Sequence, residues 1–125
     1  MKYLFIMVVI LFCSSIKAKS TSGNNLLLNC HEFIKYDQGQ TYNSEKRTRC
    51  ISYIKGAFDS FYSLKGYLNK DEIQDVCIPI KVTKDQIVRV VYLYLRNHPS
   101  KLKQTGSSIV ILSLIDKFPC KNKQK

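Results

Sequence analysis

Apolar residues recur every three or four positions through most of this chain, which is the spacing of one face of an α-helix. The first such stretch begins at Asn24 or Asn25, both of a helix-capping type, and ends near Gly39, where glycine permits the turn that closes a helix. Its apolar face consists of Leu26, Cys30, Phe33 and Ile34. We therefore expect a first helix between these limits.

A second stretch begins at Asn43 or Ser44, has the acidic Glu45 in its first turn and stops near Gly66. Its apolar positions are Cys50, Ile54, Ala57, Phe58 and Phe61, with Ile51 and Tyr62 widening the stripe. Gly56 lies in the middle of this helix, where it costs about 1 kcal/mol relative to alanine. That cost predicts a close approach by another helix at Gly56.

A third stretch opens with Thr83 and Gln86, which have the spacing of a capping box. It ends at His98, because Pro99 cannot continue a helix but suits the start of the next element. Its apolar positions are Ile87, Val88, Val90, Val91, Tyr92, Tyr94 and Leu95. Since these positions cover more than one face, we expect this helix to lie centrally in the fold.

The last apolar stretch is ambiguous, because residues 107–115 are rich in β-branched side chains and also suit a buried strand. We expect a helix, since the preceding elements are helical and offer no partner strand. Small residues would let it pack tightly: Gly106, Ser107, Ser108 and Ser113. With a short helical turn over 71–76, the prediction is an all-α bundle of four main helices plus one short helical turn.

The N-terminus has the features of a secretion signal. An apolar run over residues 3–13 follows Lys2 and precedes small residues that end at Ala18. The run is too short for a stable membrane helix, so we predict a cleaved signal peptide at 1–18, a helical domain at 24–120 and a basic tail at 121–125. The alternative is an uncleaved membrane anchor. After cleavage we expect no stable membrane anchor and a periplasmic location.

Charge narrows the choice of partner. The predicted mature chain has 107 residues, 18 of them basic and 9 acidic, which gives a net charge of +9. A positive field favours acidic proteins, anionic lipid headgroups or cell-wall polymers. Nucleic acid is disfavoured, because the basic residues are spread along an exported chain.

Four cysteines remain after residue 18, and an even number in a small exported domain predicts two disulfides. Three pairings are possible in principle. Helical hairpins around Gly39 and Pro99 favour Cys30–Cys50 and Cys77–Cys120, because each pair would then lie on facing elements. The bundle is therefore expected to be stapled twice.

Catalytic and metal-binding motifs are lacking in the sequence. Zinc ligands usually occur as closely spaced pairs, whereas these cysteines are widely and singly spaced. Cys30 and His31 are neighbours, but consecutive helical side chains diverge by about 100°. The chain also has no nucleophile elbow and no phosphate-binding glycine loop. We expect no enzyme activity, no metal and no cofactor, which leaves binding through surface shape.

The ordered motifs CxxYxxG, CIPxxVTxxQ, YLxxHP and FPC resemble the Rap/Tai family of immunity proteins associated with type VI secretion. They begin here at Cys50, Cys77, Tyr94 and Phe118 and cover nearly the whole mature chain. The resemblance implies a periplasmic, disulfide-bonded helical protein that inhibits a toxic effector, notably a peptidoglycan amidase, by blocking its active cleft. Several members of the family form homodimers.

Contact residues vary within that family, so none is transferred by motif. We expect the loops around 36–42 and 67–75 to reach the partner, since they join rigid helices and carry tyrosine and acidic side chains. The candidate contact residues are Tyr36, Tyr42, Tyr67, Asp71, Glu72 and Asp75. The alternative function is a periplasmic stress chaperone or another small exported binding protein. Two histidines and nine acids offer no built-in acid switch, which disfavours the chaperone.

Overall fold

The computed structural model describes residues 20–67 and 76–120, and this part of the chain is helical without a β-sheet. The predicted signal peptide, the basic tail and residues 71–75 of the short helical turn predicted over 71–76 lie outside the described residues, whereas Val76 is described and forms an isolated β-bridge with Pro119. The elements are α2 (Gly23–Asp37), α3 (Ser44–Tyr67), α4 (Lys84–Asn97), the 3₁₀ turn η1 (Pro99–Lys101) and α5 (Gly106–Lys117). The predicted all-α class with four main helices is confirmed.

Helix α2 begins earlier than expected. Ser22, not Asn24 or Asn25, is the N-cap, and its hydroxyl accepts a hydrogen bond from the Asn25 amide at 3.4 Å. The cause lies in the tertiary structure. The Gly23 amide donates to the Gln104 carbonyl, which holds the chain extended up to the first residue of the helix.

The other helix limits follow the sequence signals more closely. The Asn43 side chain accepts from the Lys46 amide at 2.9 Å and caps α3. Thr83 and Gln86 form the expected capping box, with reciprocal bonds of 3.3 and 2.8 Å. Helix α4 stops before Pro99, and α5 is a helix, as predicted, and not a strand.

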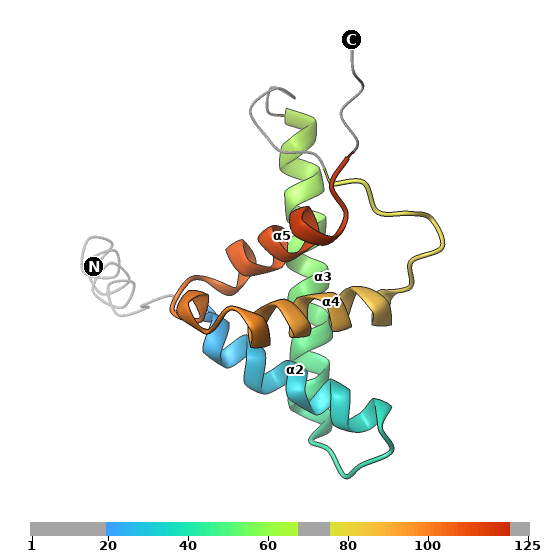
Figure 1. Cartoon of the computed structure of the whole chain (residues 1–125), viewed down its shortest axis with the longest axis vertical. Helices are drawn as coiled ribbons and strands as arrows, with labels where there is room; N and C mark the ends of the chain where they lie inside the picture. The colour runs from blue at the N-terminus through green and yellow to red at the C-terminus, as the bar shows by residue number, and fades with distance from the viewer. Residues whose placement is uncertain (1–19, 68–75, 121–125) are drawn as a thin grey trace, which may run out of the picture.

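Helix α3 is the longest element, and α2, α4 and α5 cross it one above another (Figure 1). Helices α2 and α3 form one hairpin, whose turn contains Gly39 at a φ of 68°. Helices α4 and α5 form a second hairpin around η1. The end of α3 farthest from the first turn extends beyond the other helices (Figure 1).

Both predicted disulfides are present, but they occupy different environments. Cys30–Cys50 joins α2 to α3 inside the first hairpin, and both cysteines are completely buried. Cys77–Cys120 joins the segment before α4 to the residues after α5; there Cys77 is exposed and Cys120 is half-buried. Loop-closure entropy suggests that each bond stabilises the fold by about 3–4 kcal/mol.

The core is apolar and draws on every helix. Its buried residues are Leu26, Cys30, Phe33, Cys50, Ile54, Val76, Val88, Val91, Tyr92, Tyr94, Leu95, Ile109, Val110 and Leu114. Helix α4 contributes the most of these, as expected for a central helix. Helix α3 contributes only Cys50 and Ile54 to these buried residues, so a large part of its surface lies outside the core.

The expected close helix approach at Gly56 is wrong. A Cβ atom placed on Gly56 would meet no other atom within 4 Å. The close contacts occur instead at Gly23, against the Leu102 backbone, and at Gly106, against the ring of Tyr53. Of the small residues expected to pack tightly in α5, Gly106 and Ser113 are buried, whereas Ser107 and Ser108 are exposed.

Candidate functional site

The predicted contact residues fall at opposite ends of α3. Tyr36 and Tyr42 flank the α2–α3 turn, whereas Tyr67 is the last residue of α3 and is 88% exposed. A helix of 24 residues is about 36 Å long, so these tyrosines do not form one site. Asp71, Glu72 and Asp75 lie outside the described residues, and their role stays a prediction.

Tyr36 and Tyr42 do meet at the α2–α3 turn. Their rings pack edge to face with centroids 5.0 Å apart, and both remain partly open to solvent. The Arg47 guanidinium lies 4.0 Å from the Tyr36 centroid and 6.0 Å from that of Tyr42, within cation–π range. We call Tyr36, Tyr42 and Arg47 the tip cluster.

Arg47 also lies close to the hydrophobic core. Its guanidinium carbon lies 5.9 Å from the ring centroid of the buried Phe33, and its Nε atom is buried without a hydrogen-bond partner. The guanidinium therefore lies among three aromatic rings, which favour its position. This arrangement was not expected from the sequence.

The buried Glu32 fastens the turn beneath the tip cluster. One carboxylate oxygen accepts from the Lys35 ammonium at 2.8 Å, and the other accepts from the Asn43 amide at 2.7 Å. These two hydrogen bonds, Lys35 first, hold the pKa of Glu32 below its ordinary value. Glu32 thereby connects the last turns of α2 to the first residue before α3.

Backbone hydrogen bonds make the same turn rigid. The amides of Gln38, Gly39 and Gln40 all donate to carbonyls in the last turn of α2, at 2.9 to 3.2 Å. Asp37, at the end of α2, also pairs with Arg89 of α4. The tip cluster is consequently supported by a turn that is already ordered before any partner binds.

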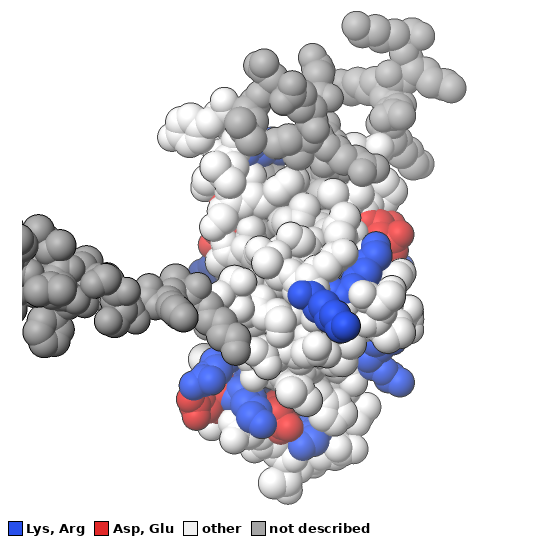
Figure 2. Space-filling view, turned by 90° about the vertical axis from the view of Figure 1, so that its left-hand side faces the viewer, with Lys and Arg blue, Asp and Glu red and all other residues white. Residues whose placement is uncertain are grey.

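A polar groove lies along the α2–α3 hairpin, between the first half of α2 and the first half of α3. It is lined by Thr21, Asn25, Leu28, Asn29, Lys46, Arg49, Ser52 and Tyr53. Arg49 is partly neutralised by Glu45, whereas Lys46 has the groove's other positive charge. Figure 2 shows basic side chains low on one face of the molecule, interspersed with acidic ones, and further basic side chains near mid-height.

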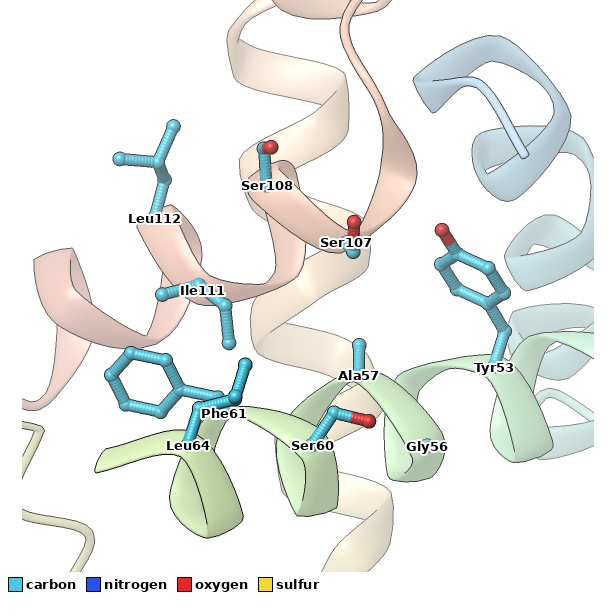
Figure 3. Close-up of a pocket in the computed structure, with 10 residues that line it drawn as sticks. All are labelled: Tyr53, Gly56, Ala57, Ser60, Phe61, Leu64, Ser107, Ser108, Ile111 and Leu112. Atoms are coloured by element: carbon cyan, nitrogen blue, oxygen red, sulfur yellow. The ribbon is translucent and has the colours of Figure 1, made fainter. Parts of the chain in front are cut away.

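A second groove, the α3–α5 groove, contains no charged residue. It is lined by Tyr53, Gly56, Ala57, Ser60, Phe61, Leu64, Ser107, Ser108, Ile111 and Leu112. In Figure 3, Phe61 and Leu64 gather near Ile111 at one end, and Ala57 faces Ser107 nearer to Tyr53. Small residues thus form its floor, and bulky apolar residues form one rim.

The described residues offer few side chains arranged for catalysis or metal binding. No group of three His, Cys, Asp or Glu side chains in 20–67 and 76–120 is placed to hold a metal ion. The His31 ring lies 3.0 Å from the Tyr92 hydroxyl and that of His98 lies 2.8 Å from the Tyr94 carbonyl, so each histidine has a structural partner. Across the same residues, every helix is too short or too polar to cross a bilayer.

A family model described as Rap1a immunity proteins matches residues 22–120. The chain belongs to this family. The match extends from the α2 cap, Ser22, to Cys120, so it includes all four helices and both disulfides. Neither a curated protein nor a solved structure matches the chain.

Membership of the Rap1a family confirms the resemblance expected from the motifs, and it indicates an immunity function against a secreted effector. Proteins of this kind are generally not enzymes. The tip cluster, the polar groove and the α3–α5 groove are therefore the candidate surfaces for binding.

Proposed function

We propose that this Rap1a protein is exported to the periplasm and protects its cell by binding a toxic effector, a peptidoglycan amidase delivered by type VI secretion. Inhibition follows from occlusion, because the bound protein covers the active cleft of the effector. The apolar run before Ala18 and the two disulfides support export to an oxidising compartment. The family match supports the immunity role.

The observation that carries this proposal is the tip cluster. Tyrosine and arginine are enriched among the residues that dominate binding energy in protein interfaces. Here two tyrosines are 48% and 37% exposed, yet they are held by Arg47 and by an ordered turn. Little conformational entropy is lost when such a rigid projection enters a cleft, so more of the contact energy appears as affinity.

Charge defines the complementary surface on the effector. Arg47 lies in the tip cluster, and Lys46 and Arg49 line the polar groove. An acidic rim around the effector cleft would speed association with this end of the molecule and would make the rate fall with salt. The effector contact is therefore expected at the α2–α3 end and not at Tyr67.

Alanine variants at the two ends of α3 test this placement. Purified Tyr36→Ala and Tyr42→Ala proteins should bind the cognate amidase about 10- to 100-fold more weakly, which corresponds to the loss of a central interface contact. Tyr67→Ala removes an equally large and more exposed ring at the far end, and its affinity should stay within about twofold. Calorimetry with amidases encoded beside the gene measures all three, and circular dichroism confirms folding.

Protection of cells provides the second measurement. Bacteria that express a periplasm-directed amidase should survive with the wild-type protein and with Tyr67→Ala, but should lyse with the double variant Tyr36→Ala/Tyr42→Ala. Loss of protection in Tyr67→Ala alone would place the contact at the opposite end of α3. Failure of the wild-type protein to bind or protect against any such amidase would refute the proposed function itself.

We also propose that the protein forms a homodimer through the α3–α5 groove. A chain with net charge +9 is repelled by its own copy wherever charged faces meet, so a self-contact favours an uncharged face. The α3–α5 groove has such a lining, and its bulky rim can fill the small-residue floor of a second copy across a two-fold axis. This face is separate from the tip cluster, which leaves both tips of the dimer free to bind effectors.

A further inference from the structure

The two disulfides differ in their access to solvent. Cys30 and Cys50 are both 0% exposed, beneath the α2–α3 hairpin. Cys77 is exposed and Cys120 is half-buried, although this bond closes a separation of 43 residues. Thiol–disulfide exchange requires a thiolate to approach a sulfur atom directly, so access determines which bond reacts.

We propose that Cys77–Cys120 is an exchange site for dithiols, which open it in the folded protein while Cys30–Cys50 stays intact. A dithiol thiolate attacks Sγ of Cys77, which forms a mixed disulfide and releases Cys120 as a thiolate. The second thiol of the same dithiol molecule then loses its proton and attacks the reagent sulfur that is bonded to Cys77. This step releases Cys77 as a thiolate. The dithiol leaves oxidised, and the protein gains two electrons and two protons as two thiols.

Contacts around the bond explain why the fold survives its reduction. The Cys77 amide donates to the Phe118 carbonyl at 2.8 Å, and Val76 and Pro119 form an antiparallel bridge. Val76 is 4% exposed, and its carbonyl accepts from the Tyr62 hydroxyl at 3.0 Å. These contacts keep the two segments side by side when the covalent bond is absent.

The buried Cys30–Cys50 disulfide stays intact in the folded protein. Cys30–Cys50 lies within the core cluster, so a reductant reaches its sulfur atoms only after the first hairpin opens. The outer bond is therefore the one that dithiols, including CxxC proteins of the exported compartment, make and break in native protein. Its reduction removes the covalent link between the segment before α4 and the end of α5, while the hydrogen bonds between these segments, and the α2–α3 turn, remain in place.

Differential alkylation of the mature protein tests the proposal. The protein is incubated with dithiothreitol at pH 8 without denaturant, sampled over time, alkylated with iodoacetamide and mapped by peptide mass. Cys77 and Cys120 should be labelled together at least tenfold faster than Cys30 and Cys50, while the helical circular dichroism signal persists. Labelling of all four cysteines at one rate, or of Cys30 and Cys50 first, would overturn the proposal.

A trapping experiment identifies the attacked sulfur. A CxxC oxidoreductase whose second cysteine is replaced by alanine should form a mixed disulfide with Cys77, and none with Cys30 or Cys50. The double variant Cys77→Ala/Cys120→Ala should remain folded with a lower melting temperature, and it should form no adduct. An unfolded double variant would contradict the proposal, because the reduced state would then not be native. None of these measurements depends on effector binding.

Discussion

Glu32 shows how one side chain determines the shape of a binding surface. It lies on the buried side of α2, yet its carboxylate reaches the first residue before α3 and a lysine one turn away. A buried carboxylate is tolerated only when it is paired and hydrogen-bonded, and Glu32 meets both conditions. Its loss would loosen the turn that supports Tyr36 and Tyr42.

The pH dependence of stability tests this role. Because the folded state holds the pKa of Glu32 below 4.5, its carboxylate contributes stability that is complete above the unfolded pKa and is lost as the pH falls through the lower folded value. Glu32→Gln should therefore melt at a lower temperature than wild type at pH 7. The difference should shrink steadily as the pH is lowered below about 4.5, where protonation of the unfolded carboxyl becomes dominant.

Glu45→Gln is the matched control, since Glu45 is 70% exposed and pairs with Arg49 on the same helix. Its effect on unfolding should stay within about 0.5 kcal/mol at any pH. Thermal melts followed by circular dichroism between pH 2 and 8 compare the three proteins. Equal pH profiles for wild type and Glu32→Gln would show that Glu32 does not fasten the turn.

Residue chemistry alone predicted part of the tip cluster. Tyr36 and Tyr42 were expected in an exposed loop that reaches a partner, because that segment joins two rigid helices and offers tyrosine side chains; both rings are partly exposed, and their contact with a partner stays a prediction. The part played by Arg47 was not expected, since its stacking depends on how α3 lies against α2. Contacts within a turn can be inferred from spacing, whereas contacts between helices depend on their relative rotation.

At the scale of elements, the sequence predicted the limits of a helix correctly where residues close in sequence determine them. The capping box at Thr83 and the stop before Pro99 involve atoms a few residues apart, so the sequence contains the whole interaction. The start of α2 differs, because bonds to Gln104 and Leu102 set it. The role of Gly23 could not be inferred from the sequence, because it contacts residues about 80 positions away.

Three glycine substitutions separate packing from helix propensity. A methyl group at Gly23 would lie 2.9 Å from the Leu102 Cα and carbonyl oxygen and would strike Ile109, so Gly23→Ala should destabilise the fold by about 2 kcal/mol or more. At Gly106 the nearest atom is Tyr53 Cε1, at 2.8 Å, and the ring can turn away, so a smaller loss is expected. Gly56→Ala should stabilise by about 0.5–1 kcal/mol, since nothing lies within 4 Å.

Urea unfolding at micromolar concentration measures these free energies, and the order of the three variants matters more than any single value. The helical content of the folded variants should remain that of wild type. Destabilisation by Gly56→Ala would restore the close helix approach expected at that position. If Gly23→Ala left the free energy of unfolding unchanged, the start of α2 would not be packed tightly against the connection between α4 and α5.

At the scale of the whole molecule, the disulfide pairing was predictable because it follows from topology. Two helical hairpins place the four cysteines in facing pairs whatever the details of packing, and both pairs are present. The difference in solvent exposure between the two disulfides was not predictable, since it depends on which parts of the folded chain cover each pair of cysteines. The α3–α5 groove escaped prediction likewise, because its two walls are more than 40 residues apart in sequence.

The predicted dimer is tested by placing charge in that groove. Leu64 is 57% exposed on its rim, so Leu64→Lys costs the monomer little but brings two like charges together across a two-fold contact. Light scattering coupled to gel filtration should give twice the monomer mass for wild type and the monomer mass for Leu64→Lys. Leu28→Lys, at a residue 62% exposed in the polar groove, carries the same charge and should stay dimeric. A monomeric wild type at 100 μM, or dissociation by Leu28→Lys alone, would refute self-association through the α3–α5 groove.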